Sequence, residues 1–173
     1  MNEREKCGLK MPKAQARRGA LDELDFEIVR VLSDAPELTN KAVASRLGIA
    51  ESTCAYRVRR LRDSAVIRPR RLELDYAQLG YALTAVITVH LANHSREVVD
   101  RFIESMVRTP GVLQVMNLTG RYDFMVTVAV ADAEQLRAFV LDHVTVDPSV
   151  RATETHIVFD KREGDWVPTP PAV

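Results

Sequence analysis

The sequence has few cysteines and no long apolar run. Among 173 residues only Cys7 and Cys54 are cysteine, and neither has a C-x-x-C or Cys/His spacing. We therefore expect two free thiols in a reducing cytoplasm and no metal site. The longest apolar stretch, Leu83–Leu91, is interrupted by two threonines and a histidine. It is about half the ~20 residues of a helical span, so we expect no membrane segment.

Signatures of export and catalysis are also missing. Residues 1–6 are charged and contain no apolar segment, so we expect no signal peptide. No Ser/His/Asp, Cys/His or paired-carboxylate pattern stands out, and the four histidines are scattered. They are His90, His94, His143 and His156. We therefore expect no catalytic residues and no cofactor.

The net charge of zero hides an uneven distribution. Residues 17–71 carry a net charge of +4, whereas residues 72–173 carry −6. Within residues 39–71, nine basic side chains accompany two acidic ones. Such a division indicates that the first half binds a polyanion and that the second half has another task.

Two helices are predicted early in the chain. The first begins at the N-cap Asp22 and carries an apolar stripe as far as Leu32. The second, over residues 40–47, is capped by Thr39 and ends at Gly48, a residue type that commonly ends helices in a left-handed conformation. A third helix follows directly, which makes the segment a helix-turn-helix.

This third helix, over residues 51–64, is basic and is expected to enter the major groove of DNA. Its inner face consists of Cys54, Val58 and Leu61. The residues predicted to contact bases from the opposite face are Ser52, Thr53, Tyr56, Arg57 and Arg60. Arg57 can offer its guanidinium fork to guanine O6 and N7. The residues predicted to contact phosphates are Lys41, Arg59, Arg62, Arg68, Arg70 and Arg71. The alternative is a solvated helix face that only keeps the domain soluble.

The second half has the order β-α-β-β-α-β, which is typical of a ferredoxin-like fold. We therefore predict an α+β protein. Its predicted parts are a flexible basic tail (1–19), a winged helix-turn-helix domain (20–74, with the wing at 66–74), a linker (75–80), a ferredoxin-like domain (81–163) and a loose C-terminal tail (164–173). The strands are expected at 82–91, 112–119, 124–131 and 150–160, with helices at 95–107 and after Asp132.

Taken together, these segments resemble the Lrp/AsnC family of feast/famine regulators over about residues 20–163. The motifs that carry the resemblance are LDELD (21–25), NKAVASRLGI (40–49), STC (52–54), RVRRL (57–61), PGV (110–112), TGRYDF (119–124) and residues 153–158. The resemblance implies a regulator of transcription that binds double-stranded DNA. It also implies homodimers that assemble into tetramers or octamers, and an amino acid as effector.

In the family pattern the effector lies where effector domains meet. The residues that this implies here are Asn117, Thr119, Gly120, Arg121, Tyr122, Asp123 and His156. Their chemistry fits an amino acid, because Gly120 lets backbone N–H groups approach an anion, while Arg121 can attract a carboxylate. Asp123 can receive an ammonium group. From the residues alone, an ordinary hairpin turn is the alternative.

Three positions depart from the family pattern. Ala50 replaces a usual capping Ser or Thr, and Ala65 replaces the Gly that usually ends the third helix. We therefore expect this helix to depend on its neighbours. His156 replaces an aromatic residue of some relatives, which raises the alternative of a pH-sensitive pocket.

Two other functions stay open. Sirohaem decarboxylases resemble the same two-domain architecture, but they have no need for an arginine-rich helix. A ligand-binding module could instead use its winged helix for protein contacts, and salt-dependent DNA binding would separate it from a regulator.

Overall fold

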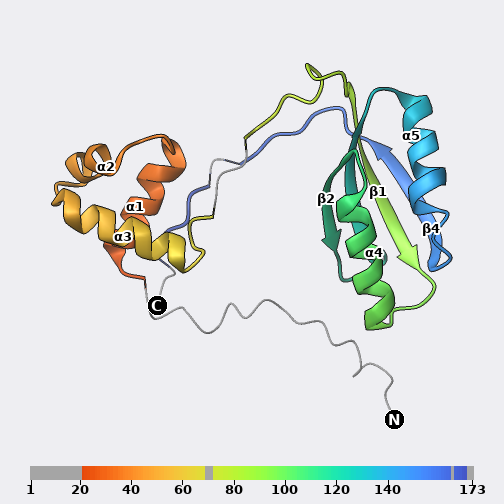
Figure 1. Cartoon of the computed structure of the whole chain (residues 1–173), viewed down its shortest axis with the longest axis horizontal. Coiled ribbons are helices and arrows are strands. Elements are labelled where there is room, and N and C mark those ends of the chain that lie inside the picture. The colour runs from red at the N-terminus through yellow and green to blue at the C-terminus, as the bar shows by residue number, and fades with distance from the viewer. Residues whose placement is uncertain (1–20, 69–71, 165, 171–173) are drawn as a thin grey trace, which may run out of the picture. The chain divides into compact units, whose positions relative to one another are not determined.

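The computed structural model describes residues 21–68, 72–164 and 166–170 (Figure 1). They form two compact units, one with the described residues up to Leu72 and those after Arg162, and the other spanning Glu73–Arg162. We describe each unit by itself. None of the helices in these ranges has the length and apolar character that crossing a bilayer requires. The predicted tail (1–19) and two predicted phosphate contacts, Arg70 and Arg71, lie outside the described residues.

The N-terminal unit consists of α1 (Glu23–Asp34), α2 (Asn40–Leu47) and α3 (Glu51–Asp63). The predicted capping of α1 is confirmed, because the Asp22 carboxylate accepts the N–H of Asp25 at 3.0 Å. The Asp25 carboxylate in turn accepts the N–H of Asp22 at 3.1 Å, which completes a reciprocal capping box.

The turn between α2 and α3 also has the predicted form. The hydroxyl of Thr39 caps α2 by accepting the N–H of Ala42 at 3.2 Å. Gly48 ends the helix with a φ of 66°, which is left-handed. Glycine adopts this conformation without steric cost, so the chain can reverse towards α3.

Helix α3 has the two weak ends expected from its sequence. Ala50 stands at the N-cap and makes no side-chain hydrogen bond to the helix. Ala65 has a φ of 57°, and among the described residues it is the one non-glycine with a positive φ. A left-handed alanine costs about 1–2 kcal/mol. Packing stabilises the helix instead, through buried side chains that include Cys54, Val58 and Leu61.

The predicted wing contains no β-strand in its described residues, 66–68 and 72–74. Directly after α3 the N–H groups of Val66 and Ile67 both donate to the carbonyl of Leu61, at 2.9 and 3.0 Å. These bonds hold the chain in a compact turn. A strand pair would need a second extended segment beside the first, and residues 72–74 adopt no regular structure.

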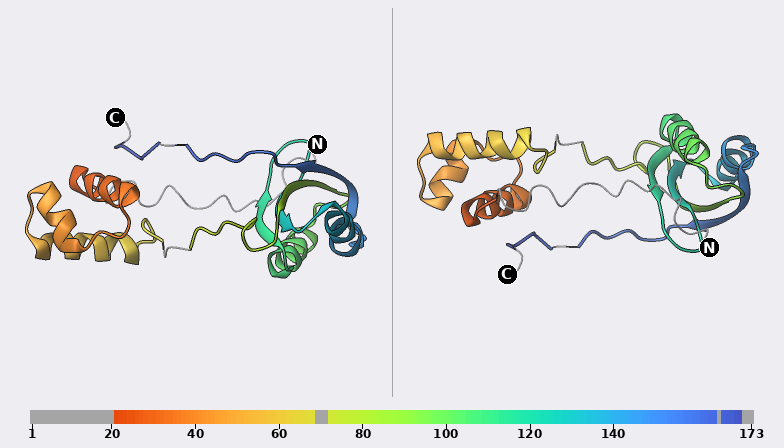
Figure 2. Two further views of the ribbon diagram at one scale, coloured as in Figure 1. Left: turned by 90° about the horizontal axis from the view of Figure 1, so that it is seen from above. Right: turned by 90° about the horizontal axis from the view of Figure 1, so that it is seen from below.

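The C-terminal unit is a four-stranded antiparallel sheet with the order β2-β3-β1-β4. The strands are β1 (Leu83–Leu91), β2 (Val112–Asn117), β3 (Phe124–Val130) and β4 (Val150–Ile157). Helices α4 (Arg96–Arg108) and α5 (Ala133–Phe139) cover one face (Figure 2). Alternate residues of the central strands, including Ile87 and Val126, pack against Phe102 and Phe139 of these helices. The predicted ferredoxin-like fold is confirmed.

After α5 the chain forms a wider π-helical turn, η3 (Val140–Val144), where the sequence predicts one continuous helix. The N–H of Thr145 donates to the carbonyl of Val140 at 2.9 Å, five residues back. The wider turn places Val144 in the core, five residues after the buried Phe139. A regular α-helix would have directed His143 there, so the apolar residue gains the buried position.

Candidate DNA-binding face and effector site

Two of the predicted base-contacting arginines are bound inside the N-terminal unit. Arg57 Nη1 donates to both carboxylate oxygens of Asp22, at 2.6 and 2.7 Å, and to Asp25 Oδ1 at 3.0 Å. Arg60 Nη2 donates to the other oxygen of Asp25. Asp25 is completely buried, so these arginines neutralise a carboxylate that has lost its water. They attach α3 to the first turn of α1.

The prediction that Arg57 lies opposite the apolar face of α3 is therefore wrong. Cys54 precedes Arg57 by three positions and Leu61 follows it by four, so all three lie on one side of the helix. The Arg57 side chain is only 21% exposed. The ion pair raises the pKa of Arg57 and lowers the pKa of Asp22, chiefly through the hydrogen bonds between the two side chains.

The centre of the outer face of α3 belongs to Ser52, Tyr56 and Arg59, spaced by four and three residues. The Arg59 side chain is 84% exposed. Its Nε lies 3.8 Å from Asp63 Oδ2. This ion pair is long and exposed to solvent, so it does not hold the guanidinium firmly. The other predicted DNA contacts that the structure exposes are Lys41, Thr53, Arg62 and Arg68. Most of the predicted DNA-contacting residues that the structure describes are therefore exposed, whereas Arg57 is mostly enclosed by its ion pairs.

The predicted effector residues lie mainly on the hairpin between β2 and β3. The N–H of Leu118 donates to the carbonyl of Asp123 at 2.8 Å and closes this hairpin. Gly120 has a φ of 124°, and a side chain there would meet no atom within 4 Å. Its backbone is therefore open to an approaching molecule. The exposed members of the predicted set are Asn117, Thr119, Gly120, Arg121 and His156.

Glu154 of β4 joins this group, and the sequence analysis missed it. The Arg121 guanidinium lies 3.7 Å from Glu154, and His156 Nε2 lies 3.9 Å from it. The Tyr122 hydroxyl hydrogen-bonds to Glu154, and this bond is the main reason that the pKa of Tyr122 is raised. The signal was available, because residues two apart in a strand share a face and His156 was already singled out.

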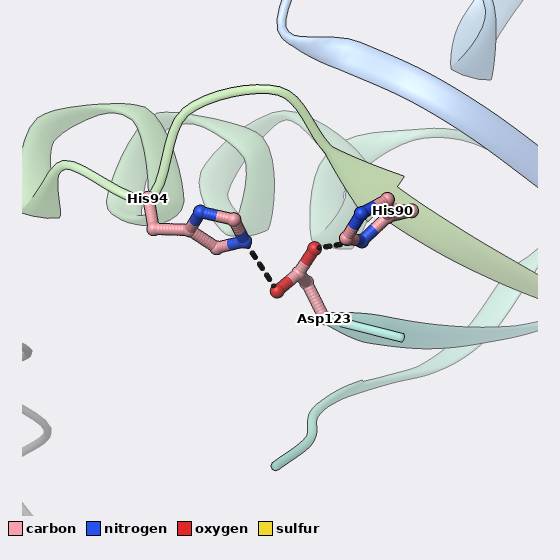
Figure 3. A group of neighbouring side chains, drawn as sticks. All are labelled: His90, His94 and Asp123. Carbon is pink, nitrogen blue, oxygen red and sulfur yellow. Dashed lines mark hydrogen bonds and ion pairs between the residues drawn. The ribbon is translucent and has the colours of Figure 1, made fainter. Parts of the chain in front are cut away.

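Asp123 has partners that the sequence did not predict. Its carboxylate lies between two imidazoles, with Oδ2 3.0 Å from His90 Nδ1 and Oδ1 2.8 Å from His94 Nε2 (Figure 3). The N–H of Leu91 also donates to Oδ2, at 2.7 Å. The interpretation of the histidines as scattered is therefore wrong for these two, because the fold brings the end of β1 and the loop before α4 to the start of β3.

Two hollows of the C-terminal unit lie away from the hairpin. Two open hollows of about 280 and 300 Å³ share Tyr81, Gly111 and Ala129 in their linings. Neither is lined by any predicted effector residue. The exposed members of the predicted set therefore present a polar surface on the hairpin and the neighbouring strand β4.

Comparison with known proteins gives both units a family. Residues 21–68 match a winged helix-turn-helix DNA-binding model, and residues 84–164 match the Lrp/AsnC ligand-binding domain. The chain is 38% identical over 144 residues to the HTH-type transcriptional regulator AldR of Mycolicibacterium smegmatis. This match covers 83% of this chain and 84% of that protein.

Solved structures agree with this assignment. The crystal structure of MtbAldR matches with a TM-score of 0.68 and 35% identity, covering 86% of this chain and 100% of that one. The transcriptional regulator NMB0573 of Neisseria meningitidis, solved in complex with L-Met, matches with a TM-score of 0.75 and 26% identity over 83% and 93% of the two chains. These relatives are named as regulators and not as enzymes, which leaves the decarboxylase alternative without support. The chain therefore belongs to the Lrp/AsnC family and is a DNA-binding transcriptional regulator with a ligand-binding domain.

Proposed function

We propose that this regulator recognises its operator through the outer face of α3 centred on Ser52, Tyr56 and Arg59. The observation that carries the proposal is the exposure of Arg59, at 84%, beside arginines that are held by Asp22 and Asp25. A guanidinium that is free to turn can take the O6 and N7 atoms of guanine or a phosphate. Lys41, Arg62 and Arg68 are exposed and supply phosphate contacts.

Salt dependence tests this proposal. The full chain is titrated against a DNA fragment from upstream of its own gene, by fluorescence anisotropy at increasing salt. Release of counterions from several phosphates makes the logarithm of the binding constant fall steeply and linearly with the logarithm of salt concentration. Absence of binding at low salt would contradict the proposal and favour a winged helix that contacts protein.

A regulator that binds operator DNA acts where the chromosome is, which in a bacterium is the cytoplasm.

The effector in this proposal is an amino acid bound at the β2–β3 hairpin. Arg121 is 82% exposed and suits the carboxylate of the effector, while Glu154, 3.7 Å away, suits its ammonium group. Both groups of an amino acid are attached to one carbon, so a cation and an anion this close can bind them together. We transfer the ammonium contact from Asp123 to Glu154, because the Asp123 carboxylate already lies against three nitrogen atoms.

A second copy of the chain completes the site in our proposal. The hairpin surface has protein on one side, and an amino acid held firmly is usually enclosed by its pocket. Homodimers that assemble into tetramers or octamers would supply the opposite wall. Native mass spectrometry with and without effector measures the assembly, and a monomer under both conditions would contradict this part.

A thermal-shift screen against the twenty amino acids identifies the effector, because a ligand that binds only the native state raises the melting temperature. The Arg121→Ala variant should lose the shift, whereas Arg137→Ala, which changes an exposed arginine of α5, should keep it. If no amino acid shifts the wild type, or if Arg121→Ala keeps the full shift, the proposed effector site is wrong.

A further inference from the structure

The cluster of His90, His94 and Asp123 has the composition of a metal site. The three side chains come from the end of β1, from the loop before α4 and from the residue before β3. Their candidate ligand atoms all lie within 4.8 Å of one another. Figure 3 shows the carboxylate between the two rings, with a different oxygen directed at each ring.

The backbone fixes the carboxylate of this cluster. The N–H of Asp123 donates to the carbonyl of Val89 at 2.9 Å, and its carboxylate accepts the N–H of Leu91 at 2.7 Å. Its side chain is 18% exposed. A ligand oriented by hydrogen bonds from its surroundings is typical of metal sites, because the orientation is then set before the ion arrives.

The histidines are free enough to adjust. The side chains of His90 and His94 are 35% and 52% exposed, and the latter belongs to a loop. In a tetrahedral zinc site with bonds of about 2.0–2.2 Å, ligand atoms lie about 3.3–3.5 Å apart. The present contacts of 2.8 and 3.0 Å are shorter by less than 1 Å. A small rotation of His94 away from the carboxylate makes room for an ion.

We propose that His90, His94 and Asp123 bind a divalent transition-metal ion, with Zn²⁺ as the best match, and leave one coordination position open to solvent. Two imidazoles and one carboxylate suit Zn²⁺ and its neighbours, whereas Ca²⁺ and Mg²⁺ need mainly oxygen ligands. The ion would join the end of β1 to the β2–β3 hairpin, because Asp123 closes that hairpin. Neither DNA nor an amino acid takes part, so this proposal stands or falls separately from the proposed function.

The test uses the full chain, prepared without a polyhistidine tag and treated with a chelator. Zinc chloride is added in a calorimeter, and cobalt chloride is added in parallel with visible absorption as the readout. We expect one ion per chain at about micromolar affinity or tighter. We also expect cobalt d–d bands without the sulfur-to-cobalt charge-transfer band that would indicate ligation by Cys7 or Cys54.

Variants locate the ion. His94→Ala removes a half-exposed loop side chain and should fold normally, yet it should weaken Zn²⁺ binding at least tenfold. His156→Ala is the matched control, since this exposed histidine lies outside the cluster, and it should bind like the wild type. Wild-type binding weaker than about millimolar would overturn the proposal. Unchanged affinity in both His94→Ala and Asp123→Asn would also overturn it.

Discussion

Each unit of the molecule holds a carboxylate between two basic side chains, but the bases differ. Asp25 is fully buried beside Arg57 and Arg60, and guanidinium groups keep their charge at all ordinary pH values. Asp123 is partly exposed between His90 and His94, whose neutral rings can bind a metal ion. The Asp25 cluster is a structural contact inside the fold, whereas in our proposal the Asp123 cluster can bind a metal ion instead. A charged residue therefore indicates function only after its partners inside the fold are known.

The largest effect on stability is expected from breaking the Asp25 cluster, which consists of Asp25, Arg57 and Arg60. Arg57→Met keeps much of the side-chain volume but removes the hydrogen bonds to Asp22 and the buried Asp25. We expect the free energy of unfolding to fall by about 2–3 kcal/mol, since hydrogen bonds to charged groups contribute about 1.5–3 kcal/mol each and Arg60 still compensates Asp25. Urea denaturation of the full chain, followed by circular dichroism, measures this.

Arg59→Met is the matched control for this stability measurement. Its guanidinium is exposed and loosely paired, so its loss should change stability by less than about 0.5 kcal/mol. Equal destabilisation by the two variants would mean that the Asp25 cluster is not a special contact.

Breaking the Asp123 cluster, which consists of Asp123, His90 and His94, should lower the free energy of unfolding by less. Asp123→Asn removes the charge that faces both histidines, but it keeps one oxygen for the N–H of Leu91. We expect a loss of about 1 kcal/mol in chelator, the contribution of an ordinary hydrogen bond. Asp142→Asn, at an exposed carboxylate of η3, should be neutral. A loss as large as that of Arg57→Met in the same urea titration would remove the distinction between the clusters.

A stabilising change of similar size is expected at the end of α3. Ala65→Gly relieves the left-handed φ of 57° and should raise the melting temperature, by an amount equivalent to about 1 kcal/mol. Ala55→Gly, in the middle of the same helix, should instead lower stability by about 1 kcal/mol. If Ala65→Gly also lowers the melting temperature, the backbone at position 65 is not strained.

The smallest expected effect is on the pH dependence of stability in acid. The ion pair with Arg57 holds the pKa of Asp22 below its ordinary value of 3.8. The Asp22 charge therefore stabilises the folded state at pH values above 3.8. This stabilisation disappears as the pH falls through the lowered pKa of the folded state. Asp22→Asn keeps an N-cap acceptor without the charge. The difference in unfolding free energy between wild type and Asp22→Asn should shrink in acid, and a difference independent of pH would show that the charge is not involved.

Much of the fold follows from local signals. The capping box at Asp22 and the left-handed Gly48 depend on neighbouring residues, so the sequence predicts them. The missing cap at Ala50 and the strain at Ala65 are equally local. The π-helical turn at Val140–Val144 was missed because tertiary packing of Val144 decides it.

The surroundings of Arg57 and of Asp123 were harder to predict, because they depend on contacts between residues far apart in the sequence. Arg57 and Asp22 are 35 positions apart, and His90 and Asp123 are 33 apart. Helical periodicity, correctly applied, places Arg57 on the side of Cys54 and Leu61, but it cannot show that Asp22 and Asp25 bind its guanidinium. Likewise, Glu154 lies beside the β2–β3 hairpin only because β4 pairs with β1.

DNA affinity separates the two arginines, because in our proposal Arg59 contacts operator DNA whereas Arg57 holds α3 against α1. Wild type, Arg57→Met and Arg59→Met are compared on one operator fragment, at a salt concentration and temperature where all three are folded. We predict that Arg59→Met weakens binding about tenfold or more, corresponding to the 1–3 kcal/mol of a good base contact. Arg57→Met should stay within about threefold of wild type, because in the folded variant Cys54, Val58 and Leu61 still pack α3 and the side chains of its outer face are unchanged. A large loss for Arg57→Met together with normal affinity for Arg59→Met would contradict the account.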